Sequence, residues 1–139
     1  MNDIIRIGVD LDGTLARYDG LEWTDYDPAK IGPPIPEMVE RVRRWLAKGH
    51  DVVIFTARVC VGIGGHNQKE ADISRGAIES FCMEQFGKVL EVTCVKDSRM
   101  KELWDDKAVS IERDTGRILT IGIAEREEAE EPDSLGSLL

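Results

Sequence analysis

The sequence predicts an α/β protein, a Rossmann-like three-layer sandwich built around a mostly parallel central sheet. Short apolar runs rich in β-branched residues alternate along the chain with longer stretches in which apolar residues recur at the helical period of about 3.6 residues. Strands that alternate with helices form βαβ units, whose parallel strands are covered by the connecting helices. The length of 139 residues, of which 42% are apolar, suits one compact domain.

Three apolar runs predict the buried strands of this sheet. Each run is short, contains β-branched residues and is bounded by polar or turn-forming residues. The three are residues 4–9 (IIRIGV), 52–55 (VVIF) and 89–95 (VLEVTCV).

Two helices are predicted between these strands. Residues 36–48 begin with a proline, which the first turn of a helix tolerates, and Gly49 ends the periodic pattern. Residues 68–86 carry apolar side chains broadly on one side, and Gly87 ends this second helix. The resulting order of strand, helix, strand, helix and strand is typical of a parallel sheet.

A β-hairpin is predicted near the C-terminus. Before it, a short helical turn over residues 98–102 is expected to lead into Leu103-Trp104-Asp105-Asp106. Residues 107–112 (KAVSIE) and 117–123 (RILTIGI) are then expected to pair as strands across a turn in which Gly116 supplies the positive φ.

The negative charge is concentrated at the C-terminal end. The chain has 18 basic and 27 acidic residues, and residues 124–139 contribute −5 of the net charge of −9. A segment this acidic and without aromatic residues predicts a disordered tail after a folded domain over residues 1–123. The −4 left for that domain argues against an extended nucleic-acid footprint, because such a footprint needs a basic face.

Membrane insertion and a disulfide framework are also not expected. The longest run without charge, residues 59–68, is glycine-rich and much shorter than the ~20 apolar residues of a membrane span. The N-terminus lacks the basic start and the cleavage site of a signal peptide. Cys60, Cys82 and Cys94 show no paired spacing, so we expect free thiols in a cytoplasmic protein.

Polar side chains follow each of the three predicted strands at the point where it ends, and a fourth short segment ends on Asp105 and Asp106. In an open parallel sheet these ends lie along one edge, where α/β proteins bind their ligands. The residues expected at this edge are Asp10, Asp12, Thr56, Lys96, Asp105 and Asp106. Crowded carboxylates repel one another unless a cation neutralises them, and Mg²⁺ prefers oxygen ligands of this kind. Lys96 and Thr56 are then expected to face the oxygens of a bound phosphate.

Each of these features has an ordinary structural explanation when it is taken alone. An Asp-x-Asp after a strand commonly caps a turn or a helix, and Thr56 can satisfy a local backbone group. Lys96 and the pair Asp105-Asp106 can be solvated surface residues. Their order along the chain and their shared edge favour a functional site.

These residues resemble the four motifs of the haloacid dehalogenase-like (HAD) superfamily. Asp10-Leu-Asp-Gly-Thr-Leu15 is similar to the first motif, Phe55-Thr56-Ala57-Arg58 to the second, Lys96 to the third and Asp105-Asp106 to the fourth. The motifs occur in order over residues 4–112. The stretch VTCVKDSRMKELWDDKAV is also similar to small HAD-like proteins that are common in bacteriophage and prophage genomes.

The resemblance implies a HAD-like fold and a phosphatase. Asp10 would be the nucleophile that attacks phosphorus and becomes an aspartyl-phosphate. Asp12 would protonate the leaving oxygen and then activate water, and a second Asp at this position is typical of phosphatases and mutases in the superfamily. Thr56 would hold the phosphate by a hydrogen bond, and Lys96 would neutralise charge on the nucleophile and the phosphate.

The resemblance also implies a magnesium site. Mg²⁺ would be held by the Asp10 carboxylate, the Asp12 main-chain carbonyl and a carboxylate of Asp105 or Asp106, with the choice between these two left open. Gly13 would let the backbone approach the phosphate closely.

The loops at the two usual insertion points are too short for a separate cap domain, through which HAD-type enzymes select their substrates. These loops are residues 16–35 and 59–67, so we expect no large cap. An open crevice admits a nucleotide or the phosphorylated end of a polynucleotide, and also another phosphorylated small molecule. Arg58 follows Thr56 by two residues, so it is expected either to reach a substrate phosphate or to form a surface salt bridge.

The main alternative is a non-catalytic module of the same fold that binds metal or phosphate without turnover. Phosphotransfer between substrates would use the same residues, and the missing cap argues against it. A protein that binds a partner through its acidic tail is a further alternative. Asp97, which directly follows Lys96, could pair with that lysine and divert it from the site. The oligomeric state and the physiological substrate stay open at this stage.

Overall fold

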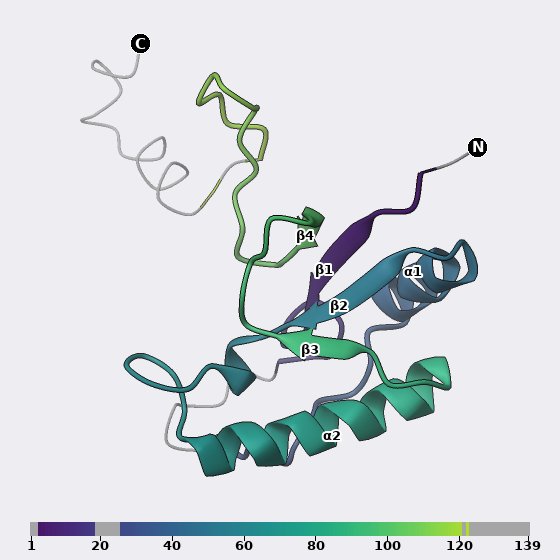
Figure 1. The fold of residues 1–139 in the computed structure, drawn as a ribbon, viewed down its shortest axis with the longest axis vertical. Coiled ribbons are helices and arrows are strands. Elements are labelled where there is room, and N and C mark those ends of the chain that lie inside the picture. The colour runs from purple at the N-terminus through teal and green to yellow at the C-terminus, as the bar shows by residue number, and fades with distance from the viewer. Residues whose placement is uncertain (1–2, 19–25, 121, 123–139) are drawn as a thin grey trace, which may run out of the picture. The chain divides into compact units, whose positions relative to one another are not determined.

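The fold is known from a computed structural model that describes residues 3–18, 26–120 and 122 (Figure 1). Its elements are β1 (Arg6–Asp10), α1 (Pro36–Ala47), β2 (Asp51–Phe55), the 3₁₀ turn η2 (Ala57–Val59), α2 (Gln68–Phe86), β3 (Glu91–Thr93) and β4 (Met100–Trp104). No helix among the described residues is long and apolar enough to cross a membrane.

The four strands form a single sheet in the order β3-β2-β1-β4, and every neighbouring pair is parallel. Helices flank this sheet, so the predicted α/β class is confirmed, and the arrangement is consistent with a Rossmann-like three-layer sandwich (Figure 1). The strand β1 lies in the middle of the sheet, between β2 and β4. All four strands therefore end at the same edge.

The chain divides into two compact units, which meet between Asp106 and Lys107. The first unit holds the sheet and both helices. In the described residues of the second, which end at 120 apart from 122, the predicted pairing across residues 113–116 is present as an antiparallel bridge, Ile111 to Ile118, and no strand is formed. Gly116 has the expected positive φ of 78°. The predicted tail over residues 124–139 lies outside the described residues.

The two predicted helices are confirmed almost to the residue. The helix α1 starts at Pro36, as the tolerance of a first turn for proline predicts. In α2, the Asn67 side chain accepts a hydrogen bond from the Glu70 N–H, and the Glu70 carboxylate accepts one from the Asn67 N–H. This capping box begins the helix, and Gly87 ends it with a left-handed φ of 73°.

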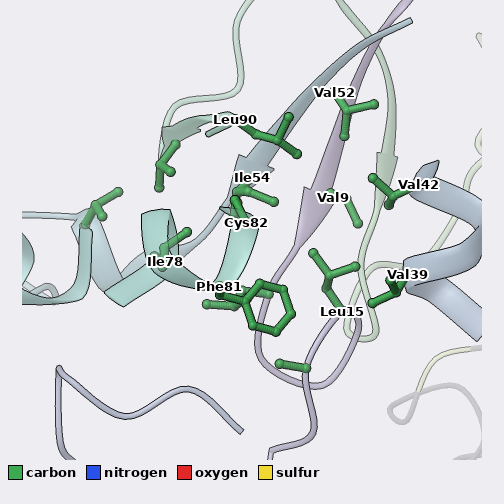
Figure 2. Packing of buried hydrophobic residues seen from close by; sticks show 14 residues of the cluster. Val9, Leu15, Val39, Val42, Val52, Ile54, Ile78, Phe81, Cys82 and Leu90 are labelled. Atoms are coloured by element: carbon green, nitrogen blue, oxygen red, sulfur yellow. The ribbon is translucent and has the colours of Figure 1, made fainter. Parts of the chain in front are cut away.

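One core joins both helices to the sheet, as Figure 2 shows. The α1 helix contributes Val39 and Val42 to this core, and α2 contributes Ile78, Phe81 and Cys82. All three cysteines are free thiols, as predicted. The apolar face of each helix packs against the sheet. This packing fixes the positions of the central strands, and the residues that follow these strands therefore lie along one edge.

The predicted helical turn over residues 98–102 is wrong. The Asp97 carboxylate accepts hydrogen bonds from the N–H groups of Arg99 and Met100, which closes a tight turn instead. From Met100 the chain enters β4, which pairs with the free side of β1. The hydrogen bonds offered by that strand outweigh the helical preference of a short polar segment. The outcome matters for function, because β4 carries Asp105 and Asp106 to the edge.

A buried arginine ties three strand-bearing segments together. Arg6, at the start of β1, is only 6% exposed. Its guanidinium donates to Asp51 at 2.8 Å, to Glu91 at 2.6 Å and to Asp97 at 3.0 Å. The hydrogen bond from Arg6 lowers the pKa of Asp97. Asp97 is therefore directed towards Arg6, and within the described residues it forms no ion pair with Lys96, the alternative that the sequence left open.

Arg6→Gln is expected to lower the free energy of unfolding by about 1–3 kcal/mol, because charged hydrogen bonds at a buried arginine are lost. The matched control is Arg99→Gln, whose exposed guanidinium lies 3.9 Å from the same Asp97 carboxylate and should contribute less than about 0.5 kcal/mol. Urea unfolding at pH 7 measures both values. A carboxylate with a lowered folded-state pKa stabilises above its unfolded pKa and loses this effect as pH falls. The difference between wild type and Arg6→Gln should therefore shrink in acid, and an equal loss in the two variants would contradict the assignment.

Candidate functional site

Three carboxylates converge where the central strands end. Asp10 is the last residue of β1, and Asp105 and Asp106 directly follow β4. Because Val9 pairs with Trp104 in parallel register, the next residue of each strand arrives at the edge side by side. One ligand oxygen from each of the three aspartates lies within 4.8 Å of the other two. The predicted meeting of these residues is therefore present in the structure.

The turn after β1 folds back over this group. The Leu11 carbonyl accepts hydrogen bonds from the N–H groups of Leu15 and Ala16, both at 2.9 Å. This turn brings the Thr14 hydroxyl to 3.3 Å from Asp10 Oδ2 and to 3.3 Å from Asp106 Oδ1. Thr14 belongs to the first motif, but the sequence predicted no role for it. The signal was a hydroxyl four residues after Asp10 in a tight turn, from where it reaches back to the strand end.

Gly13 is required by the close approach of Asp106. Its φ is +89°, and a Cβ at this position would lie 2.7 Å from Asp106 Oδ2. Any other residue would combine backbone strain with displacement of that carboxylate. The Gly13 N–H donates to the Ala16 carbonyl at 2.8 Å. The close approach predicted at Gly13 is thus an approach to Asp106, and the Gly13 N–H is already engaged within the turn.

Crowding changes the electrostatics of Asp10. Burial, the hydrogen bond with Asp106 and the charges of Asp105 and Asp106 raise the pKa of Asp10 to about 7, against a lowering by the Thr14 hydroxyl. A hard divalent cation fits this donor set, because oxygen ligands suit it and its charge relieves the repulsion. Asp12 contributes no carboxylate to the group of three.

Asp12 instead faces Arg58. Arg58 Nε donates to Asp12 Oδ2 at 2.7 Å, and Arg58 Nη2 donates to Asp12 Oδ1 at 2.9 Å. The arginine side chain is 10% exposed and that of Asp12 is 24% exposed. Burial lowers the pKa of Arg58, but the hydrogen bond and charge of Asp12 outweigh burial, so the pKa is raised overall. Of the two predicted alternatives for Arg58, the structure shows an ion pair, and it is a buried one.

Thr56 contacts the main chain of Arg58. It is 3% exposed, its N–H donates to the Thr93 carbonyl, and its hydroxyl oxygen accepts the Arg58 N–H at 3.2 Å. This contact caps the 3₁₀ turn η2 and is the local backbone role considered for Thr56. The hydroxyl proton is not used in that hydrogen bond, so Thr56 can still donate to a ligand oxygen.

Lys96 stands apart from both groups. It follows β3 by three residues and is exposed. Among the described residues, it forms no ion pair with Asp10, Asp105 or Asp106. The structure therefore gathers the predicted residues as a trio of carboxylates and as an Asp12–Arg58–Thr56 group, and it leaves Lys96 on the same edge without contact.

Comparisons with known proteins leave the function open. No protein-family model and no curated protein matches the chain. Among solved structures, the fold is similar to that of a conserved protein from Bacteroides thetaiotaomicron. The two chains share 21% sequence identity, with 91% of this chain and 89% of that chain covered and a TM-score of 0.47. This likeness is too distant to indicate an activity.

Asp106→Asn should lower the pKa of Asp10 in the metal-free protein, because it removes one of the neighbouring charges that raise it. A carboxyl whose folded-state pKa is raised from 3.8 to about 7 costs stability as the pH rises through that interval. In the presence of a chelator, the variant should therefore melt at a higher temperature than wild type at pH 8. The two melting temperatures should become equal near pH 4.

Carbon-detected NMR titration of the Asp10 carboxyl and thermal unfolding measure the two effects. Glu84→Gln, an exposed carboxylate on α2, is the matched control and should change neither. An unchanged Asp10 titration in Asp106→Asn would contradict the assignment of Asp106 as a cause of the raised pKa of Asp10.

Proposed function

We propose that this protein is a Mg²⁺-dependent phosphomonoester hydrolase of HAD-like type that works through an aspartyl-phosphate on Asp10. The observation that carries the proposal is the convergence of Asp10 with Asp105 and Asp106 at the carboxyl edge of a parallel sheet, with Asp12 two residues further on. Ligand sites of open α/β sheets occur at this edge. The resemblance of the same residues to the four HAD motifs supports the assignment.

Two aspartates in different surroundings supply the chemistry. In the first step, an Asp10 oxygen attacks phosphorus, the ester P–O bond breaks, and the leaving oxygen takes a proton from Asp12. In the second step, Asp12 takes a proton from water, the water oxygen attacks phosphorus, and the acyl-phosphate bond breaks to release inorganic phosphate and the free Asp10 carboxylate. A cation bound at the carboxylate trio would favour the ionised form of Asp10, which is the form that a nucleophile needs.

The carboxylate trio would hold the cation. Asp10 and a carboxylate of Asp105 or Asp106 would be its protein ligands together with the Asp12 carbonyl, and a bound Mg²⁺ would neutralise charge between the nucleophile and an incoming phosphate. Thr14 orders the trio, because its hydroxyl lies within hydrogen-bond distance of both Asp10 and Asp106.

The phosphate would be held from the opposite side. The Thr56 hydroxyl retains its proton for a phosphate oxygen, and the exposed Lys96 would supply a positive charge to the phosphate. In the described residues of 16–35 and of 59–67 there is no α-helix and no strand that could form a cap. An open site of this kind suits a nucleotide or a polynucleotide-end phosphate.

Phosphate release in Mg²⁺ from a panel of esters tests this function. The panel contains an aryl phosphate, nucleoside monophosphates, sugar phosphates and 3′-phosphorylated oligonucleotides. Asp10→Asn should reduce turnover by at least about 10³-fold, because removing a nucleophile generally costs more than that. Chelation should abolish turnover, and Mg²⁺ should restore it. Asp114→Asn, an exposed residue with a φ of 66° that asparagine also adopts, is the matched control.

The outcomes separate the alternatives. Turnover that survives in Asp10→Asn would exclude Asp10 as the nucleophile. Mg²⁺ binding by a folded wild-type protein that releases phosphate from no ester would favour a non-catalytic metal- or phosphate-binding module.

A further inference from the structure

We propose that Arg58 is a positioning residue for Asp12, which holds the carboxylate in one orientation for proton transfer. This inference rests on the proposed function, in which Asp12 exchanges protons with the leaving oxygen and with water. It assigns Arg58 to the aspartate and not to the substrate phosphate.

Arg58 and Asp12 form a bidentate ion pair, in which the guanidinium acts as a fork with two donor nitrogens. Nε and Nη2 of Arg58 each donate to a different oxygen of Asp12, at 2.7 and 2.9 Å. Two parallel hydrogen bonds fix the plane of a carboxylate, which a single ammonium cannot do. Each carboxylate oxygen has about two lone-pair sites, and the fork occupies one on each. The remaining site on each oxygen is held in a defined direction, where a proton can be carried.

The arginine is itself held from several sides. Its main-chain N–H donates to the Thr56 hydroxyl, within the short turn η2. Its guanidinium lies 5.4 Å from the centre of the Tyr26 ring, a favourable distance for a cation and an aromatic face. The Tyr26 hydroxyl lies 3.0 Å from Ser74 Oγ on α2, and the ring stacks on His66. The fork on Asp12 is thus anchored to the scaffold.

A second arginine shows what a purely structural role looks like in this fold. Arg6 is buried to a similar extent, and all three of its guanidinium nitrogens donate to carboxylates. Arg58 directs two nitrogens at Asp12, while its third, Nη1, is buried and has no hydrogen-bond partner among the residues that the structure describes. A buried donor left unpaired is costly, so packing alone does not explain the residue. Both hydrogen bonds that the Arg58 guanidinium donates go to the Asp12 carboxylate, which belongs to the proposed site.

The test compares esters with different leaving groups. An aryl phosphate releases a stable anion and needs little protonation, whereas a nucleoside 5′-monophosphate releases an alkoxide that must be protonated. For a reaction through a covalent intermediate, kcat/KM covers the steps up to departure of the leaving group. Arg58→Gln should lower kcat/KM by about 10- to 100-fold for the nucleotide and by less than about 3-fold for the aryl ester. Arg58→Lys, which keeps the charge but lacks the fork, should show the same selectivity to a smaller degree.

A double-variant cycle provides the second readout. With Asp12→Asn as the background, adding Arg58→Gln should cost less than about 2-fold, because residues that act as a unit are not additive. The control is Arg43→Gln, a half-exposed arginine on α1 that donates to the Gln85 carbonyl and should change neither ester. Thermal unfolding of each variant confirms that it is folded under the assay conditions.

Each result has a defined meaning. Selective loss with the nucleotide, together with non-additivity, supports the positioning role. Equal losses in kcat/KM for the two esters would overturn it and would identify Arg58 as a contact of the substrate phosphate or a residue needed only for folding. A folded wild-type protein that releases phosphate from no ester of the full panel would overturn the proposed function itself, and this inference with it.

Discussion

Parallel pairing of β1 with a strand on each side is the constraint on which the rest of the structure depends. This pairing aligns the ends of β1, β2 and β4, so residues more than 90 positions apart in the chain meet at one edge. Register decides the detail: Val9 opposite Trp104 brings Asp10 beside the acidic pair that follows β4. The core behind the sheet and the Arg6 ion pairs hold the strands in this register. The site is therefore a consequence of strand alignment and not of a local motif alone.

Two aspartates separated by one residue occupy opposite electrostatic environments. Asp10 ends a strand and lies among like charges, which raise its pKa, whereas Asp12 lies beyond the strand and opposite a buried guanidinium. The tight turn that follows Asp12 contributes to this difference, because the positive φ of Gly13 lets the Asp106 carboxylate approach the backbone. Arg58 balances the charge of Asp12, and a cation at the carboxylate trio would relieve the crowding around Asp10.

Local signals in the sequence were sufficient for most of the fold. The helical period, the capping residues around Asn67 and the glycines at the helix ends predicted α1 and α2 closely, because these features act over a few neighbouring residues. The segment from Met100 to Trp104 was assigned wrongly in part, because it is polar and its strand conformation depends on a partner. β1 offers that partner across the sheet, and nothing within the segment itself indicates it. The strands expected over residues 107–112 and 117–123 were likewise reduced to a single bridge.

The sequence by itself determined the α/β class, the order of its elements and which polar residues follow the strands. Those properties depend on apolar periodicity and on turn chemistry, both of which are local. Only the tertiary structure decided that Asp105 and Asp106 both join Asp10, that Thr14 reaches two of these carboxylates, and that Asp12 belongs with Arg58. It also decided that Lys96 stays exposed while Asp97 turns to Arg6. These contacts join groups that are far apart in the chain. The distances between such groups, and the loss of water around them, are fixed only when the strands pair.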